Sequence, residues 1–457
     1  MTSSRRSFIR MLGAGTLTAP LAALHSRTAQ GAPAFGPGFG PLQPMLPLNT
    51  HDVILPGAFD YRGQPLISLP EGFRYWAISI TGQTMSDGTL VPGDHDGMAC
   101  FRGDDGTTIL VRNHELSNRE SKFGNPRGVD VPEALKFDPY ANGGTTTLVL
   151  DNEGRLLRHY ASLGGTNNNC AGGPTPWGTW LSCEETTSLA APLTFQQRHG
   201  YVFEVPTMAY GPTRAQPIVG MGRFNHEATA TDPRTGIVYE TEDTGDSLFY
   251  RYVPKVPAQL LAGGTLQALK LKESTASVDT ATGFLGHLNQ PLPVEWVAID
   301  NPDPADNVFA NSTRAQGQAK GAARFRRGEG AWYGNGLVYF CCTSGGNLGA
   351  GQVWAYDPVA ETLTLVVEST DRAALEAPDN ITLGPDGRLY MYEDGAGGNN
   401  IVGLNSQGEL FHVAENCIND SEFCGGCFSN NGRFMFVNIQ SPGITLVIEG
   451  PWRKGQR

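Results

Sequence analysis

The feature that most constrains the fold is a pattern that recurs six times along the chain. Each copy is a turn followed by an alternating, strand-like run that ends in acidic or polar side chains. The six copies are Thr107–Glu115, Gly178–Glu185, Gly236–Asp243, Gly336–Thr343, Gly387–Asp394 and Gly432–Ile439. One four-stranded unit of a repetitive β-fold takes about 40 to 50 residues. Six copies in 457 residues therefore fit a repetitive fold with insertions.

This periodicity predicts an all-β chain folded as a six-bladed β-propeller with insertions between the blades. We expect the propeller to span residues 71–450, with a long insertion at about 251–327, and residues 32–70 to form an N-terminal arm. Few stretches have the period of a helix, and 371–376 is the best of them. A pair of β-sandwiches is the structural alternative, but it does not explain why the repeats end alike.

Charge and hydropathy limit the partners of such a chain. Lys and Arg number 33 against 45 Asp and Glu, which gives a net charge of −12. This balance repels nucleic acid and anionic lipid, because both depend on basic contacts. No run reaches the ~18 to 20 apolar residues of a membrane span. We therefore expect no nucleic-acid partner and no membrane insertion of the mature chain.

The N-terminus has the parts of an export signal. Ser4-Arg5-Arg6-Ser7-Phe8 supplies paired arginines, an apolar stretch follows, and small residues stand near Ala29-Gln30-Gly31. Paired arginines ahead of an apolar stretch are read by the twin-arginine translocation machinery. We expect residues 1–31 to be a twin-arginine signal peptide and the mature protein to be periplasmic or extracellular. A disordered basic tail is the alternative interpretation.

Acidic residues recur at fixed positions relative to the repeats. About 13 to 15 residues before the end of a repeat stand Cys170, Glu227, Glu329, Asp379 and Cys424. Because the innermost strands of a propeller line one channel, residues entering these strands can meet residues that end the next strands. The predicted inward ring is Glu184, Glu185, Glu227, Glu242, Asp243, Glu329, Asp379, Glu393 and Asp394, with Cys170, His114 and Glu115 nearby.

So many carboxylates cannot share one axis as bare charges, because close like charges raise one another's pKa. Bound cations would remove this conflict, and oxygen ligands favour hard ions such as Ca²⁺. One thiolate in the set also admits a transition metal, with iron and zinc as candidates. A lone acid more often accepts hydrogen bonds from a backbone turn. Arg324, Arg326 and Arg327 form either a solvated face or a clamp for phosphate.

The longest motif resembles the signature of the PhoX-type alkaline phosphatases. It runs Thr166-Asn-Asn-Asn-Cys170-Ala-Gly-Gly-Pro-Thr-Pro-Trp177-Gly-Thr-Trp-Leu-Ser-Cys-Glu184-Glu185. Shorter matches are Arg112-Asn-His-Glu115, Gly222-Arg-Phe-Asn-His-Glu227, Arg327-Gly-Glu329-Gly, Pro378-Asp379-Asn380 and Glu393-Asp394-Gly. The resemblance runs from about residue 70 to 445. It implies a twin-arginine-exported propeller whose channel holds ferric iron and calcium and hydrolyses phosphate monoesters.

Carried over residue by residue, the resemblance implies a ligand set for these metals. Cys170 would be the thiolate on iron, and the carboxylates would be Glu184, Glu185, Glu227, Glu242, Glu329, Asp379 and Asp394. Arg327 would contact the substrate next to Glu329, and both are assigned to the catalytic site, although Arg324 or Arg326 could replace Arg327. The alternatives are a non-catalytic calcium-binding propeller and a calcium-dependent lactonase or esterase. Cys170 separates them, because a thiolate on the axis is superfluous in a calcium-only site.

Overall fold

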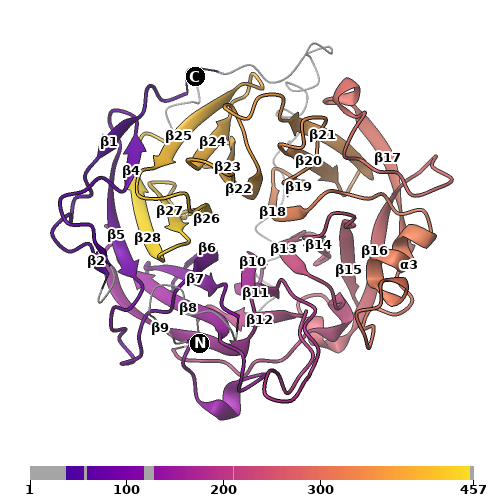
Figure 1. The fold of residues 1–457 in the computed structure, drawn as a ribbon, viewed down its shortest axis with the longest axis horizontal. Coiled ribbons are helices and arrows are strands. Elements are labelled where there is room, and N and C mark those ends of the chain that lie inside the picture. The colour runs from indigo at the N-terminus through magenta and orange to yellow at the C-terminus, as the bar shows by residue number, and fades with distance from the viewer. Residues whose placement is uncertain (1–35, 37, 56–58, 118–127, 209, 453–457) are drawn as a thin grey trace.

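Strands arranged around a central axis make up most of the structure (Figure 1). The computed structural model describes residues 36, 38–55, 59–117, 128–208 and 210–452. The predicted signal peptide, with Arg5 and Arg6, lies outside the described residues. No helix among the described residues is long and apolar enough to cross a membrane.

Six strands stand closest to the axis, and each contacts the next in a closed ring (Figure 1). These inner strands are β6 (His95–Arg102), β10 (Asn169–Pro174), β13 (His226–Thr231), β18 (Gly328–Gly334), β22 (Pro378–Leu383) and β26 (Phe423–Phe428). Each pairs antiparallel with a second strand. The second strands are β7 (Thr108–His114), β11 (Thr179–Glu184), β14 (Val238–Glu242), β19 (Leu337–Cys342), β23 (Leu389–Glu393) and β27 (Phe434–Ile439). They coincide with the six repeats of the sequence.

Outer strands extend each pair of inner and second strands into a larger group, and the groups are numbered from one to six in chain order. The outer strands are β8 (Gly143–Leu150) and β9 (Leu156–Thr166), β12 (Val202–Pro206), β15 (Tyr250–Pro254) and β16 (Gly264–Leu271), β20 (Gln352–Asp357) and β21 (Thr362–Glu368), β24 (Asn400–Leu404) and β25 (Leu410–Asn416), and β28 (Ile444–Glu449) with β5 (Arg74–Ile80). The prediction of an all-β, propeller-like fold is confirmed. Counting one group for each inner strand gives six, which is our interpretation of the number of blades.

The groups are not all separate sheets, because two of them are joined. Group three continues through β17 (Pro291–Ala298), which pairs with β21 and so joins groups three and four into one nine-stranded sheet. The region 251–327 also holds the helix α3 (Thr313–Ala319), which begins where the Ser312 hydroxyl accepts a hydrogen bond from the Ala315 N–H. The helical period at 371–376 was misleading, because this stretch forms turns.

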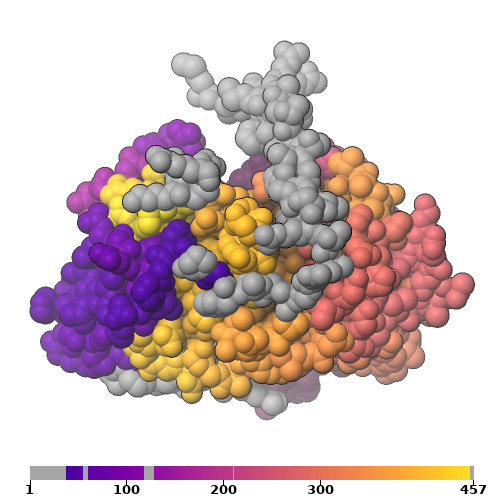
Figure 2. Space-filling model, turned by 90° about the horizontal axis from the view of Figure 1, so that it is seen from above, coloured from indigo at the N-terminus to yellow at the C-terminus, as the bar shows by residue number. Residues whose placement is uncertain are grey.

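The ring closes by pairing the two ends of the described chain. Strand β5 pairs with β28 from Ile80↔Ile444 to Arg74↔Glu449, so the N-terminal and C-terminal colours lie side by side in Figure 2. Further N-terminal strands, β4 (Ile67–Leu69) and β1 (Gln43–Met45), extend the sheet of β25. The two-residue strands β2 (Ile54–Leu55) and β3 (Phe59–Asp60) pair with each other. Short 3₁₀ turns lie at Glu133–Leu135, Val219–Met221, Leu260–Ala262, Leu285–His287 and Phe309–Asn311.

The core lies between the groups, where alternate residues of the strands meet. One cluster at the closing seam packs Tyr75, Ile448 and Leu446 against Tyr392 and Met435, all of them buried. Strand residues that point to one face pack in this way, while their neighbours point to the other. The same alternation decides which side chains reach the axis.

Candidate active site

Every inner strand is irregular close to its first residue. The register with the second strand shifts just after His95, Asn169, His226, Gly328, Pro378 and Cys424. A β-bulge leaves a residue unpaired and re-aims its side chain, which is why bulges are common next to active sites. The residues directly after these six are Asp96, Cys170, Glu227, Glu329, Asp379 and Gly425. Five of the six bulges therefore carry a side chain able to bind a metal.

The sixth bulge carries glycine for a steric reason. Gly425 has a φ of +62°, and a Cβ at this position would lie 2.4 Å from the backbone oxygen of Asp96. A larger residue would therefore strain its own backbone and collide with β6. The glycine lets the last inner strand approach the first one closely.

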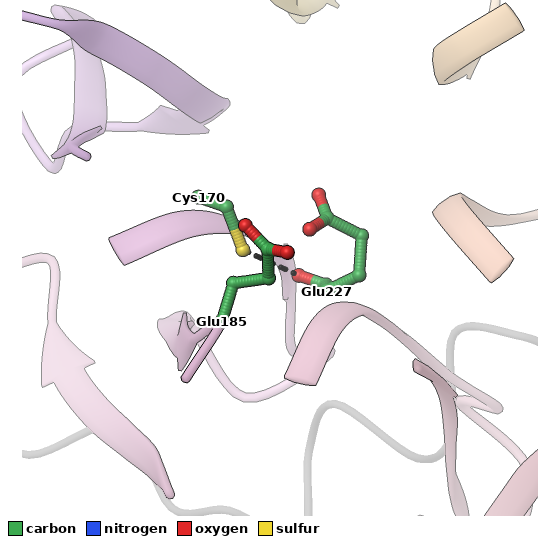
Figure 3. Close-up of side chains that lie close together, drawn as sticks. All are labelled: Cys170, Glu185 and Glu227. Atoms are coloured by element: carbon green, nitrogen blue, oxygen red, sulfur yellow. Dashed lines mark hydrogen bonds between the residues drawn. The ribbon is translucent and has the colours of Figure 1, made fainter. Parts of the chain in front are cut away.

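Two clusters of possible ligands share Glu227. The first brings together Cys170 of β10, Glu227 of β13 and Glu185, which directly follows β11 (Figure 3). The second consists of Glu227, Glu329 and Asp379. Within each cluster one ligand atom per residue lies within 4.8 Å of the others. Both clusters are built from residues that the sequence predicted.

A third cluster was largely missed by the sequence analysis. Asp96, Glu115 and Glu422 also offer ligand atoms within 4.8 Å of one another. Glu115 follows β7 and is predicted near the ring, but the repeat spacing does not predict Asp96 or Glu422. The Gln440 amide donates to Glu115 Oε2 at 2.8 Å and to Asp96 Oδ2 at 3.3 Å, which links the two side chains.

The surroundings of these clusters disfavour the ionised forms of their acids and of the thiol. Burial, followed by the neighbouring carboxylates, raises the pKa of Glu227, Glu329 and Glu185 well above the usual range. The same causes raise the pKa of Asp379 to about 6, with Asp394 as its strongest charged neighbour. Burial also raises the pKa of the Cys170 thiol, which donates to the carbonyl oxygen of His226 at 3.2 Å. A bound cation would reverse these shifts by favouring the charged forms.

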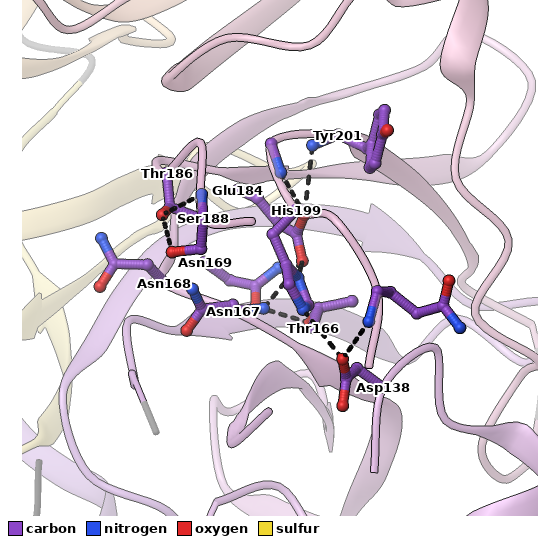
Figure 4. A network of polar contacts seen from close by, with 12 residues as sticks. Asp138, Thr166, Asn167, Asn168, Asn169, Glu184, Thr186, Ser188, His199 and Tyr201 are labelled. Carbon is purple, nitrogen blue, oxygen red and sulfur yellow. Dashed lines mark hydrogen bonds and ion pairs between the residues drawn. The ribbon is translucent and has the colours of Figure 1, made fainter. Parts of the chain in front are cut away.

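The acids that end the second strands divide into two sets. In Glu184-Glu185 the first side chain is buried away from the clusters, and the second belongs to one. Glu184 accepts hydrogen bonds from the backbone N–H groups of Asn167 and Gly200, both at 2.8 Å, and from His199 Nδ1 at 2.7 Å (Figure 4). Its oxygens are already used for holding loops together.

Two other predicted residues resemble Glu184 rather than Glu185. Glu242 is buried and accepts from Tyr250 Oη at 2.9 Å and from Arg314 Nη1 at 3.2 Å. Glu393 accepts from two backbone N–H groups, those of Glu376 and Asn400, at 2.7 and 2.9 Å. Among the described residues, neither joins a cluster. Successive strand residues point to opposite sides, so adjacent acids cannot both face the axis.

Asp394 occupies an intermediate position. It lies outside the three clusters but close enough to Asp379 to raise the pKa of that carboxyl. Its own pKa is raised by burial, against the nearby charge of Arg327. The predicted residues that the structure brings together are therefore Cys170, Glu185, Glu227, Glu329 and Asp379, with Glu115 in the third cluster. Glu184, Glu242 and Asp394 stand apart from them.

One arginine of the three candidates stands beside the clusters. Arg327 Nη2 donates to Glu329 Oε1 at 2.8 Å, and its side chain is 39% exposed. Arg324 and Arg326 are instead directed to Asp279, at 3.8 and 2.5 Å. A half-exposed guanidinium next to a cation-binding site can contact an oxyanion from solvent. Geometry thus favours Arg327 over its two neighbours.

The donor set fits metal ions of two kinds. Asp96, Glu115 and Glu422 supply only carboxylate oxygens, which suit a hard cation. Cys170 adds a thiolate to Glu185 and Glu227, and this mixture suits a transition metal. The arrangement can therefore hold several cations next to an arginine, a combination that stabilises a transferring phosphoryl group.

Comparison with known proteins agrees with this geometry. A family model described as alkaline phosphatase PhoX matches residues 56–443. The structure is similar to Pseudomonas fluorescens PhoX in complex with vanadate, a transition state analogue, with a TM-score of 0.63 and 18% identity over 85% of this chain and 96% of that one. A gluconolactonase from Xanthomonas campestris matches with a TM-score of 0.42 and 12% identity over 93% and 99% of the two chains. No curated protein matches by sequence. The match to the family model covers most of the residues from the first strands to the closing seam, and the chain belongs to the PhoX family of alkaline phosphatases.

Proposed function

We propose that this chain is an exported phosphatase that hydrolyses phosphate monoesters at the axis of the propeller with iron and calcium. One observation carries the proposal: acids and a thiol converge from successive inner strands next to the guanidinium of Arg327. A strongly acidic protein repels a phosphate dianion, so cations at the axis are required before such a substrate can bind.

The ligand chemistry of each cluster favours a particular kind of metal ion. Cys170, Glu185 and Glu227 would hold iron, because thiolate and carboxylate ligands together suit this ion. Asp96, Glu115 and Glu422 would hold calcium. Glu329 and Asp379, with the shared Glu227, would bind a further cation between them. Bound metal ions would neutralise the substrate and lower the pKa of water at the site.

The protein's own groups would bind and orient the phosphoryl group. Arg327 would donate to its equatorial oxygens, where charge develops during displacement. Asp243 holds the same guanidinium from its other side at 2.8 and 2.9 Å and so fixes its direction. Asn168 donates to Glu115 Oε1 at 3.0 Å and to Glu185 Oε2 at 3.3 Å, which keeps acids of two clusters in place. No side-chain nucleophile is needed.

The deciding experiment combines metal analysis with turnover. Protein purified from iron-replete cells should contain both iron and calcium, and it should hydrolyse p-nitrophenyl phosphate until a chelator removes the metals. Glu329→Gln keeps the size of the side chain but removes a charge, and it should reduce turnover by orders of magnitude. Glu295→Gln, at a side chain that is 43% exposed on β17, is the matched control and should behave as wild type.

Each alternative function has its own outcome in this experiment. Turnover of a lactone without turnover of the phosphate ester would support a lactonase. Fully metal-loaded protein with no turnover would support a binding propeller. Calcium without iron would contradict the mixed set of metals.

Export is tested separately from catalysis. Arg5→Lys combined with Arg6→Lys should leave folded, metal-loaded protein in the cytoplasm, because a receptor reads the arginine pair. Normal export of this double variant would contradict the twin-arginine route.

A further inference from the structure

Arg112 is a buried cation that the proposed reaction does not use. Its side chain, on β7, has no exposed surface. Among the described residues its hydrogen-bond partners are one imidazole and two hydroxyls: His95 Nδ1 at 3.0 Å, Thr445 Oγ1 at 2.6 Å and Thr146 Oγ1 at 2.9 Å. Burying a guanidinium costs free energy, and hydrogen bonds to neutral partners offset this cost only in part. We therefore expect this arginine to have a role besides stabilising the fold.

One arm of the guanidinium is connected to the backbone of Asp96. Arg112 Nη1 donates to the Thr445 hydroxyl, which itself donates to Asn438 Oδ1 at 2.6 Å. The Asn438 amide in turn donates to the carbonyl oxygen of Asp96 at 2.6 Å. Three hydrogen bonds in series thus join the buried guanidinium to the main chain of an acid of the third cluster.

The same nitrogen of Arg112 also orients the residue that precedes Asp96. His95 Nε2 lies 3.1 Å from the carbonyl oxygen of Pro92, which can only accept, so Nε2 carries the hydrogen. Nδ1 is then the acceptor for Arg112 Nη1. Burial, followed by the charge of Arg112, lowers the pKa of His95 well below its usual value, which agrees with a neutral ring. The carbonyl oxygen of His95 accepts from the Cys424 thiol at 3.0 Å, so both ends of this residue are held.

The other arm of the guanidinium reaches the residue that precedes Glu115. Arg112 Nη2 donates to the Thr146 hydroxyl at 2.9 Å, and this hydroxyl lies 2.9 Å from His114 Nε2. His114 Nδ1 is 2.8 Å from the carbonyl oxygen of Gly93 and donates to it, so Nε2 accepts from the hydroxyl. Arg112 therefore helps to fix the two imidazoles that directly precede two of the three acids in the third cluster.

These contacts cross the seam at which the ring closes. Arg112 and Thr146 belong to the first group, on β7 and β8, whereas Thr445 belongs to the sixth, on β28. The third cluster spans the same two groups, since Glu422 stands just before β26. The arginine thus ties together the two groups that must be aligned for the three acids to meet. Loss of an outer partner that orients metal ligands typically lowers metal affinity by about 10- to 100-fold.

We propose that Arg112 is a positioning residue for the third cluster and that tight calcium binding by this cluster depends on it. The arginine touches neither the cation nor the substrate, and it acts through the residues next to Asp96 and Glu115. The inference rests on the proposed function in one respect, the assignment of calcium to these acids. Loss of Arg112 should weaken calcium binding, while the cluster that contains Cys170 keeps its iron.

The test measures metal binding by the full-length mature protein. Arg112→Met removes the guanidinium from a side chain of similar shape, and calcium affinity, measured by competition with a calcium-binding dye, should fall about 10- to 100-fold. Iron content, measured by elemental analysis, should stay near that of wild type. Arg112→Lys keeps a positive charge but lacks the planar fork, so its calcium affinity should fall as well. Wild-type affinity in Arg112→Lys would show that charge alone is sufficient and would overturn the positioning role.

A further variant covers the case in which the substitutions of Arg112 prevent folding. Thr445→Val keeps the shape of a buried side chain but breaks the series between Arg112 and Asn438. Calcium affinity should fall about 2- to 10-fold, the effect of one lost hydrogen bond. Thr231→Val on β13 is the matched control, because Thr231 is also buried and its hydroxyl has no hydrogen-bond partner among the described residues. This control should bind calcium as wild type does.

The failures of the two proposals are distinguishable. Unchanged calcium affinity in Arg112→Met and Thr445→Val, or a parallel loss of iron and calcium, would overturn the role of Arg112 while leaving the phosphatase in place. Wild type that binds calcium but hydrolyses no phosphate ester would overturn the proposed function and leave the role of Arg112 intact. Wild type that binds no calcium would overturn both.

Discussion

Arg327 and Asp243 form a two-point ion pair, with Nε 2.8 Å from Oδ1 and Nη2 2.9 Å from Oδ2. The pair joins the residue that precedes β18 to the residue that follows β14. Arg327 adopts a φ of +52°, which is unfavourable for a residue other than glycine. Its N–H donates to the Thr244 carbonyl and its carbonyl accepts from the Thr343 N–H, both at 3.0 Å. The surrounding chain therefore holds the guanidinium in one direction.

Replacing this arginine should separate substrate binding from metal binding. In Arg327→Ala, kcat/KM for p-nitrophenyl phosphate should fall by about 10² to 10³, the range expected when one preorganised donor to a developing anion is lost. Metal content should stay near that of wild type, because arginine binds no cation. Arg326→Ala is the control, since Arg326 is paired with Asp279, and it should change kcat/KM little. Equal losses in both variants would contradict the role assigned to Arg327.

The thiol of Cys170 should decide which metal is retained. Cys170→Ser replaces a soft ligand by a weaker, harder one, so iron content should fall while calcium remains. Any visible charge-transfer absorption of the wild type should disappear as well. Cys100→Ser, on the same ring of inner strands but outside the clusters, should keep both. Elemental analysis and an absorption spectrum give the answer, and undiminished iron in Cys170→Ser would exclude a thiolate bond.

The buried imidazole of His199 should make stability depend on pH. Burial opposes its charge, but Glu184 at 2.7 Å and Asp138 at 3.5 Å outweigh this effect and raise the pKa from 6.5 to about 9. Because the folded pKa is the higher one, this stabilisation is fully present below pH 6.5 and is lost as the pH rises through about 9. It amounts to about 3 kcal/mol at most.

Unfolding free energies of metal-free protein between pH 6 and pH 10 test this expectation. His199→Gln should be less stable than wild type at pH 6, with a difference that narrows toward pH 10. His51→Gln, at an exposed position, should follow wild type throughout. A constant difference between His199→Gln and wild type would show that the imidazole stays neutral.

The closing seam should be the most sensitive part of the ring to loss of apolar volume. Leu446 lies on β28 with no exposed surface and packs in the cluster that joins β5 to the last group. Leu446→Ala should lower the free energy of unfolding by about 2 to 5 kcal/mol. Leu348→Ala, at a residue that is 43% exposed, should change it by about 0.5 kcal/mol or less. Denaturant titration measures both, and equal effects would argue against tight packing of the seam.

The sequence predicted much of this site because the repeats have a nearly constant spacing. Cys170, Glu227, Glu329 and Asp379 were found by counting back from the ends of the second strands, and all four occupy bulges. The same spacing does not find Asp96, because the β6–β7 hairpin is longer. The bulge at Asp96 therefore lies farther from the end of its repeat than the other bulges do. Gly93-Asp-His-Asp-Gly97 was the available signal.

Other parts of the site depend on contacts that spacing does not encode. Glu422 stands in the loop before β26 and meets Asp96 only because the ring closes. The separation of Glu184 from Glu185 follows from strand alternation, whereas the spacing of the repeats predicts the same position for both acids. The pairing of β17 with β21 joins segments that are far apart in sequence, so no local sequence pattern predicts it.

The seam between β5 and β28 also sets the order in which the protein can be completed. Strand β28 ends at Glu449, and without it β5 has no partner strand. The third cluster has the same dependence, because Asp96 and Glu115 belong to the first group and Glu422 precedes the last inner strand. The ring can therefore shut only after the ribosome has synthesised β28, so these three acids come together late in the synthesis of the propeller.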